Sequence, residues 1–92
     1  MTAPDPITGL RQRIEEIDRA VVNLIAERAA LAREVGRAKR DQRLPLLDPA
    51  REAAVVRRAG ALAREHGLPD EDVRCLFWHL VGLCRRAQVE DE

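Results

Sequence analysis

Aromatic side chains are almost absent from this sequence of 92 residues, in which Phe77 and Trp78 are the only examples and Tyr is missing. Proteins that bind single-stranded nucleic acids stack the bases on aromatic rings. The chain also lacks an excess of either charge, because its 16 basic and 16 acidic side chains cancel. No net field would attract a polyanion. We therefore expect no nucleic acid partner.

Long apolar runs and metal-binding motifs are missing as well. No window approaches the roughly 18 apolar residues of a membrane-spanning helix, and residues 1–6 lack the basic start and apolar core of a signal peptide. Cys75 and Cys84 are the only cysteines, and no second pair of Cys or His has the spacing of metal ligands. We expect a cytoplasmic protein with two buried free thiols, no metal and no membrane contact.

Lysine is scarce, because only Lys39 among the 16 basic residues is not an arginine. An ammonium is a compact point charge, whereas a guanidinium is a longer planar fork. Two interpretations stay open at this stage: chance retention on a solvated face, or a site that needs the ammonium.

Apolar residues make up 46% of the chain and recur with the period of a helix. The segment from Ile7 to Asp41 contains no proline, Thr8 or Asp5 can cap its start, and Pro45 should end it. Such a helix spans roughly 52 Å, yet a compact chain of this length is only about 30 Å across. We therefore expect a second chain to cover its apolar stripe, which contains Leu10, Ile14, Ile17, Val21, Leu24, Leu31, Val35 and Ala38.

Two shorter helices should follow. Asp48 is a candidate N-cap before Pro49, Gly67 a candidate left-handed C-cap, and Asp70 a candidate cap of the third helix. The third helix should bury Val73, Leu76, Phe77, Leu80, Val81 and Cys84. No strand pattern is present, so the predicted fold is all-α, with one domain over residues 1–92, an ordered core at 7–88 and tails at 1–6 and 89–92.

Two polar residues interrupt the apolar faces. Arg28 falls in a slot of the seven-residue repeat that calls for an apolar side chain, and a buried guanidinium is costly unless it is paired. It could reach solvent, pair with a carboxylate such as Glu27 or Glu52, or receive an anionic ligand. Gln88 continues the apolar face of the third helix, or is simply exposed near its end.

Three cations of the first helix lie on roughly one side of it. Lys39 lies three turns after Arg28, and Arg11 lies 17 residues before Arg28 on roughly the same side. They can converge on one anion only if a second chain brings one end of its helix beside the middle of this one. An antiparallel or intertwined dimer would do so.

The stretches LRQRIEEIDRAVVNLIAERAALAREVGRAK and LPLLDPAREAAVV, followed by a short helix that ends near Gln88, resemble the all-helical class of chorismate mutase. The resemblance covers residues 7–88, and its motifs are specific in combination. It implies an isomerase of aromatic amino acid biosynthesis, built as an intertwined six-helix homodimer in which both chains contribute to each of two active sites. The implied reaction is the Claisen rearrangement of chorismate to prephenate, which needs no cofactor.

The resemblance also implies how a small dicarboxylate substrate is held. Arg11 of the partner chain and Arg28 would bind the two carboxylates as guanidinium forks. Arg51 would add positive charge nearby.

Five further residues acquire roles from the resemblance. Lys39 and Gln88 would donate hydrogen bonds to the ether oxygen, and Glu52 with Asp48 would meet the ring hydroxyl. Cys84 stands where the family commonly has Ser, and a thiol is the weaker hydrogen-bond partner.

Alternatives remain. The same fold could act on 4-amino-4-deoxychorismate, whose ammonium would pair with Glu52 and Asp48. An isochorismate pyruvate lyase is less favoured, because in the mutase pattern Glu52 recognises a group at C4 of the ring. A non-catalytic helical dimer would leave the inward cations without a role, and a nucleic-acid-binding helical dimer conflicts with zero net charge.

Overall fold

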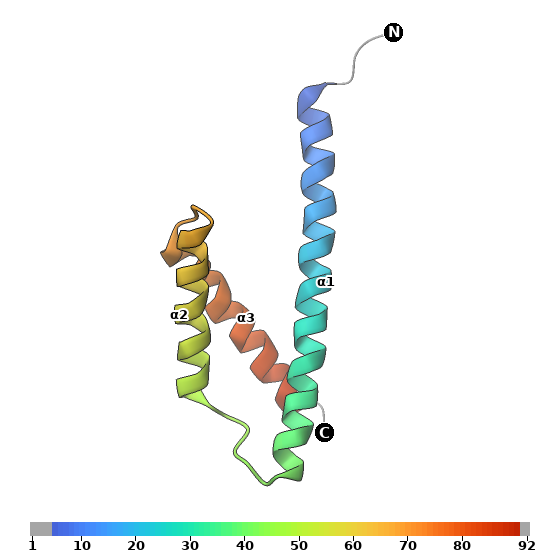
Figure 1. Cartoon of the computed structure of the whole chain (residues 1–92). Coiled ribbons are helices and arrows are strands. Elements are labelled where there is room, and N and C mark those ends of the chain that lie inside the picture. The colour runs from blue at the N-terminus through green and yellow to red at the C-terminus, as the bar shows by residue number, and fades with distance from the viewer. Residues whose placement is uncertain (1–4, 91–92) are drawn as a thin grey trace.

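The computed structural model describes residues 5–90, which form three α-helices: α1 (Pro6–Asp41), α2 (Pro49–Glu65) and α3 (Asp70–Glu90). Figure 1 shows α2 and α3 as a hairpin whose far end crosses the C-terminal half of α1. No strand occurs within residues 5–90. The all-α class predicted from the sequence is confirmed.

The start of α1 is fixed by Asp5, one of the two caps that the sequence left open. Its Oδ1 accepts a hydrogen bond from the backbone N–H of Ile7 at 3.1 Å, and Pro6 occupies the first helical position. Proline fits there because its missing N–H would have no partner in the helix. At the other end, Gln42 is the C-cap and Arg43 adopts a positive φ of 57°. The helix therefore ends at Asp41, four positions before Pro45.

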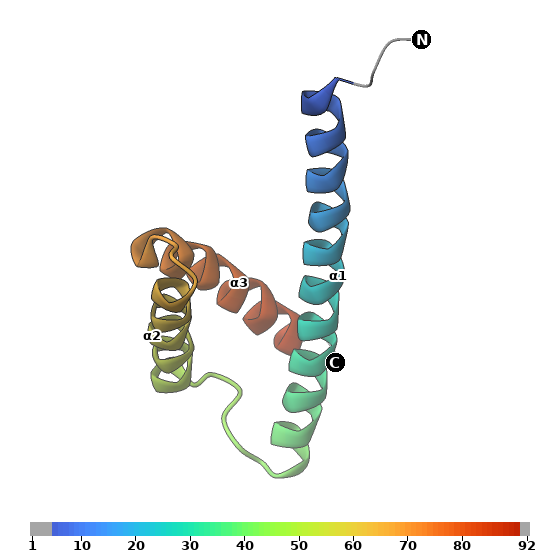
Figure 2. The same cartoon turned by 45° about the horizontal axis from the view of Figure 1, so that its top comes forward.

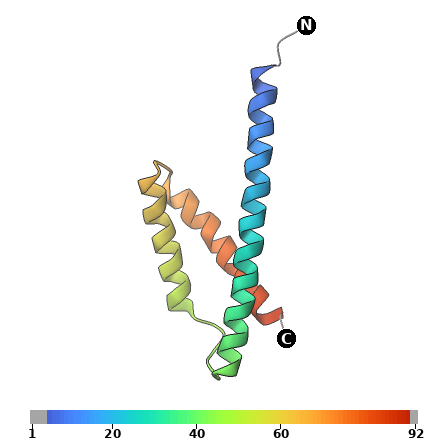
Figure 3. The same cartoon turned by 45° about the vertical axis from the view of Figure 1, so that its right-hand side comes forward.

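The N-terminal half of α1 stands clear of the rest of the chain (Figures 1, 2 and 3). The molecule measures 66 × 28 × 15 Å and has a radius of gyration of 17.6 Å, against about 12 Å for a compact chain of this length. We call the projecting apolar stripe the seam, and its side chains are between 46% and 63% exposed: Leu10, Ile14, Ile17, Val21 and Leu24. One chain alone thus leaves the seam uncovered, as the length of the helix predicted.

The turn after α2 has the predicted glycine cap. Gly67 has a φ of 69°, a left-handed conformation that costs glycine little. The chain then reverses, and the N–H of Leu68 donates to the carbonyl of Ala63 at 2.9 Å. This closing pattern satisfies carbonyls at the end of the helix.

The predicted role of Asp70 is wrong by one residue. The carbonyl of Pro69 already accepts from the N–H of Val73 at 3.2 Å, so α3 begins at Asp70 and not after it. The Asp70 carboxylate instead accepts from Arg64 Nη1 at 2.7 Å and lies 3.9 Å from Arg74. It therefore links the end of α2 to the start of α3.

The core lies where α3 packs against both other helices, which do not pack against each other. Val55 and Val56 of α2 and Val81 of α3 are buried together, with Phe77 against them. On the α1 side, a Cβ added to Gly36 would approach the carbonyl oxygen of Gln88 to 3.2 Å. Glycine thus permits the close approach of α1 and α3.

Two residues of α3 predicted to be buried are exposed. Leu76 is 67% exposed, and Cys75 is also exposed. At 100° per residue, Leu76 lies 80° around the helix from the buried Cys84, and Cys75 lies 180° from it. The face that packs is therefore narrower than the predicted stripe and leaves out Leu76, while Cys75 lies on the opposite side of the helix, so only Cys84 is buried.

Candidate active site

A cavity of about 540 Å³ lies between the C-terminal half of α1, the start of α2 and the last turns of α3. This volume is in the range of sites for small molecules. The cavity brings together seven of the eight site residues predicted from the sequence: Arg28, Lys39, Asp48, Arg51, Glu52, Cys84 and Gln88. Its other lining residues are Leu31, Ala32, Val35, Val55, Arg58, Val81 and Arg85.

Arg28 reaches the cavity from α1 and is half-buried. Its Nη1 donates to the sulfur of Cys84 on α3 at 2.9 Å. Neither Glu27 nor Glu52, the carboxylates that the sequence offered as partners, bonds to it within residues 5–90. A guanidinium that meets only a weak acceptor keeps most of its capacity to bind an anion.

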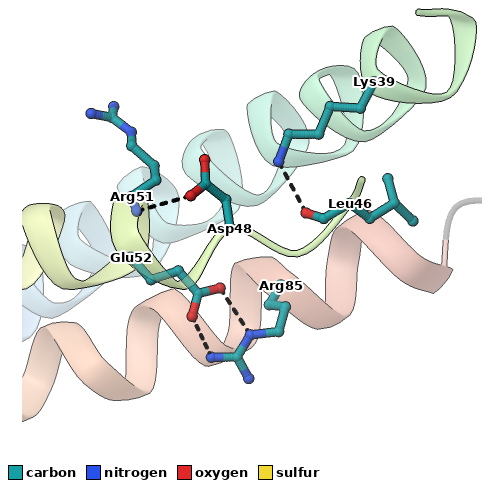
Figure 4. Close-up of polar contacts among 6 residues, drawn as sticks. All are labelled: Lys39, Leu46, Asp48, Arg51, Glu52 and Arg85. Atoms are coloured by element: carbon teal, nitrogen blue, oxygen red, sulfur yellow. Dashed lines mark hydrogen bonds and ion pairs between the residues drawn. The ribbon is translucent and has the colours of Figure 1, made fainter. Parts of the chain in front are cut away.

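Lys39 lies three turns along the same face of α1. Its Nζ donates to the carbonyl oxygen of Leu46, in the loop between α1 and α2, at 3.0 Å (Figure 4). An ammonium has three donors, so this bond holds it at the cavity wall and leaves further donors for a ligand.

The first turn of α2 supplies three more lining residues. Asp48 Oδ1 accepts from the backbone N–H of Arg51 at 3.1 Å, which is the predicted N-cap (Figure 4). Because the cap fixes the first turn, it also fixes where Arg51 and Glu52 leave the backbone. Both side chains line the cavity.

Gln88 closes the end of the cavity on α3. Arg40 Nη2 donates to its carbonyl oxygen at 2.5 Å and so ties the end of α3 to α1. The side-chain oxygen of Gln88 is buried and has no hydrogen-bond partner among the described residues. Buried polar atoms in folded proteins are normally paired, so this oxygen is left as an acceptor for a bound molecule.

Arg58 and Arg85 are lining residues that the sequence reasoning missed. Arg58 lies two turns after Arg51 on α2, a spacing that could have identified it. Arg85 Nε and Nη2 donate to Glu52 Oε2 and Oε1 at 2.9 and 2.7 Å (Figure 4). No spacing in the sequence signals this pair, because the rotation of α3 against α2 decides which side chains meet.

The pair with Arg85 sets the ionisation of Glu52. The hydrogen bonds from Arg85 hold the pKa of Glu52 below its ordinary value of 4.5, although partial burial and the Asp48 carboxylate act in the opposite direction. Lys39 adds a smaller lowering effect on the same pKa. Glu52 is therefore a carboxylate at neutral pH.

The cavity concentrates positive charge in a chain that has none overall. Five cationic side chains line it, Arg28, Lys39, Arg51, Arg58 and Arg85, against the two carboxylates Asp48 and Glu52. Five minus two leaves three positive charges in excess. The arrangement suits a small ligand with more than one negative charge.

Arg11, the eighth predicted residue, is not part of this cavity. It is exposed on the projecting half of α1, 17 residues and about 25 Å along the axis from Arg28. Its own chain cannot bring it to the cavity without breaking α1. Its predicted position in a partner's site stays a prediction.

The residues that the structure describes also bear on metals and membranes. No group of three His, Cys, Asp or Glu side chains in them could hold a metal ion. None of the three helices is long and apolar enough to cross a bilayer.

Comparison with known proteins shows which sequences and structures this chain resembles. A sequence model described as chorismate mutase type II matches residues 10–89. The chorismate mutase of Methanocaldococcus jannaschii is 36% identical over 75% of this chain and 69% of its own length. The 4-amino-4-deoxychorismate mutase of Streptomyces pristinaespiralis is 29% identical over 98% of this chain and 68% of its own length.

Longer relatives and a solved structure agree with this. The bifunctional chorismate mutase/prephenate dehydratase of Escherichia coli K12 is 36% identical over 84% of this chain, which spans only 20% of that protein. A conserved hypothetical protein from Pyrococcus furiosus superimposes with a TM-score of 0.75 at 27% identity, over 94% of this chain and 99% of its own. With the family pattern matched along nearly all three helices, the chain belongs to the chorismate mutase type II family.

Proposed function

We propose that this chain is a chorismate mutase, an isomerase that converts chorismate to prephenate, and that it acts as a homodimer. One observation carries the proposal. Seven of the eight residues expected to handle a dicarboxylate converge on one cavity that has three positive charges in excess.

The reaction is a unimolecular rearrangement in which the ether C–O bond breaks as a C–C bond forms. The enzyme must hold the enolpyruvyl arm over the ring, which is a matter of orientation. Arg28 is suited to hold one carboxylate as a fork, since within residues 5–90 its side chain bonds only to the Cys84 thiol. Arg51 adds positive charge on the opposite wall.

The ether oxygen gains negative charge as its bond to carbon breaks. Lys39, held by the Leu46 carbonyl, and Gln88, which lines the same cavity, are the donors we assign to the ether oxygen. The Gln88 side-chain N–H is the donor in this arrangement. A preorganised donor of this kind is worth about 3–4 kcal/mol in transition-state stabilisation.

The dimer rests on the seam and on Arg11. The seam follows a seven-residue repeat that helices bury against a partner helix, and within one chain it is uncovered. A second copy lying antiparallel along α1 would cover it. The same arrangement would bring Arg11 of that copy to this cavity, where it would bind the second carboxylate.

Both cysteines are free thiols, and they lie nine residues, about 13.5 Å, apart on opposite sides of α3, too far for a disulfide with each other. This fits a reducing cytoplasm, where we propose that the protein acts.

A second candidate is a mutase of 4-amino-4-deoxychorismate. The relative from Streptomyces pristinaespiralis matches 98% of the chain. In addition, the cavity contains two carboxylates, Asp48 and Glu52, that an ammonium could approach.

One assay separates these activities. Purified protein is incubated with chorismate, 4-amino-4-deoxychorismate and isochorismate in parallel, and products are identified by chromatography. We expect prephenate from chorismate, and loss of that activity in the Lys39→Ala variant. Faster conversion of the amino compound would favour the second candidate, and pyruvate from isochorismate would indicate a lyase. Turnover of none of the three would contradict an enzymatic role.

A further inference from the structure

Glu52 and Arg85 form a two-point ion pair between α2 and α3 at the cavity wall (Figure 4). The N–O distances are 2.9 and 2.7 Å, and both carboxylate oxygens are used. The Glu52 side chain is 20% exposed, so it is partly shielded from water, and the Arg85 side chain is 40% exposed. This geometry fixes both side chains more firmly than a single bond would.

The pair changes what Glu52 can recognise. Two carboxylate oxygens offer about four acceptor positions, and Arg85 occupies two of them. Glu52 can therefore still accept a hydrogen bond from a neutral hydroxyl. A cation at the same place would also meet the adjacent guanidinium, whose positive charge cancels the attraction of Glu52.

Most of the other charged groups around Glu52 are also positive. Lys39 faces it from α1, and Arg51 and Arg58 line the cavity from α2. Asp48 is the remaining carboxylate; its cap bond to a backbone N–H leaves its charge in place, but it is one carboxylate against these three cations. A ligand cation near Glu52 would thus have more positive than negative neighbours.

We propose that Arg85 is a specificity-determining residue: by neutralising Glu52, it makes the cavity select a ring that carries a neutral hydroxyl over the same ring carrying an ammonium. Arg85 acts through Glu52, so it is a positioning residue and does not touch the reacting atoms. The inference rests on the proposed function and extends it to the choice between chorismate and 4-amino-4-deoxychorismate.

The test is the ratio of kcat/KM for chorismate to kcat/KM for 4-amino-4-deoxychorismate. We expect the wild-type protein to favour chorismate. Arg85→Met removes the charge and keeps the length of the side chain. It should lower the ratio about tenfold, mainly through a lower KM for the amino compound, because Glu52 could then form a charge-assisted hydrogen bond with the ammonium. The matched control is Arg86→Met, an exposed neighbour outside the cavity, which should leave the ratio within about twofold.

A double-variant comparison tests whether Arg85 works through Glu52. In the Glu52→Gln background, adding Arg85→Met should leave the ratio within about twofold. No carboxylate then remains at position 52 whose charge Arg85 could neutralise. An equal tenfold fall in that background would mean that Arg85 meets the substrate itself, and it would overturn the proposal.

The pH profile supplies a readout that a purely structural role would not move. Without Arg85, burial and the Asp48 carboxylate would still raise the pKa of Glu52, and only the weaker effect of Lys39 would lower it. The acid limb of kcat/KM should therefore shift to higher pH in Arg85→Met. An unshifted limb together with an unchanged ratio contradicts the proposal.

Folding is followed by circular dichroism for each variant. If Arg85→Met does not fold, Arg85→Gln, which keeps a donor but no charge, is expected to give the same fall in the ratio. An active wild-type protein with an unchanged ratio in the folded variant overturns this inference alone. A wild-type preference for the amino compound also overturns it and selects the second candidate function. Absence of chorismate turnover in the wild-type protein contradicts the proposed function as well.

Discussion

Lys39 occupies a prepared position before any ligand binds. Its Nζ bonds to the Leu46 carbonyl at 3.0 Å, so the loop after α1 determines where the ammonium lies. The other 15 basic residues of the chain are arginines, and this placement explains why position 39 is a lysine. A longer, planar guanidinium could not place one donor at the same point.

Replacing Lys39 tests this placement. Lys39→Ala should lower kcat by about 10²–10³, because the lost donor acts most strongly in the transition state. KM should change much less, since the arginines that we assign to the carboxylates remain. Lys39→Arg should be poor too, although the charge is kept. Steady-state kinetics with chorismate provide the measurement, and near-normal kcat in Lys39→Arg would mean that position 39 needs only positive charge.

Glu52 makes stability depend on pH in the acid range. Its pKa is lowered in the folded protein, chiefly by the hydrogen bonds from Arg85. The stabilisation is therefore fully present above the ordinary pKa of 4.5 and is lost as pH falls through the lower, folded value.

Thermal unfolding at fixed protein concentration checks this dependence. The melting temperature of the wild-type protein should fall as the pH drops below 4.5, and Glu52→Gln should remove part of that fall. Since Glu52→Gln also leaves Arg85 without its partner, the variant should be less stable than wild type at pH 7. If the melting temperatures of the two proteins fall in parallel across the acid range, the Glu52–Arg85 pair contributes nothing to the pH dependence of stability.

Some of the residues that line the cavity could be predicted because the sequence marks them individually. Arg28 stands out in an apolar repeat, Lys39 is the lone lysine, and Asp48 precedes a proline at a helix start. The family resemblance then supplied their roles. Arg85 carries no such mark, because its role depends on which side of α3 faces α2, and Glu52 is 33 residues away.

At the scale of elements, the caps determine how much of the fold the sequence reveals. Asp5, Asp48 and Gly67 act through contacts within a few residues. Each of the three marks the end of a helix at a position that the sequence indicated. Leu76 and Cys75 were misplaced because burial depends on packing between helices. Periodicity identifies an apolar stripe, but it does not say how wide the covered part will be.

Gly36 controls how closely two helices approach. An added Cβ would come within 3.2 Å of the Gln88 carbonyl oxygen and 3.3 Å of its Cβ, so α3 would have to move by a few tenths of an ångström. Arg40 is bonded to that same carbonyl. The end of α3, and the amide of Gln88 with it, is thus positioned by a glycine on α1.

Gly36→Ala should therefore lower kcat about tenfold by displacing Gln88, even though alanine is the better helix former. Gly9→Ala is the matched control on the same helix, because a Cβ there meets nothing within 4 Å. That variant should raise the free energy of unfolding by about 0.5–1 kcal/mol and leave kcat unchanged. Kinetics and urea unfolding of both variants give the comparison. Equal kcat values for Gly36→Ala and the wild-type protein would show that the close approach of α1 and α3 at Gly36 does not matter for catalysis.

At the scale of the whole molecule, the proposed dimer makes a prediction that one chain alone cannot satisfy. Arg11→Ala and Lys39→Ala homodimers should each be inactive, because every site lacks one group. When the two chains are unfolded and refolded together, mixed dimers should contain one intact site and regain activity. Native mass spectrometry confirms that the chains have exchanged. Mixed dimers without activity would place Arg11 in the site of its own chain.

The distribution of charge has a consequence for how the molecule meets anions in solution. Three positive charges in excess line the cavity, and carboxylates elsewhere on the chain balance them to zero. The opposing fields cancel at a distance, and at physiological ionic strength screening already acts over about 8 Å. The capture radius for a small dianion is therefore short, and its encounter rate should respond only weakly to added salt. The rest of the chain carries three negative charges in excess, because the whole chain is neutral. The cavity attracts only molecules small enough to enter it.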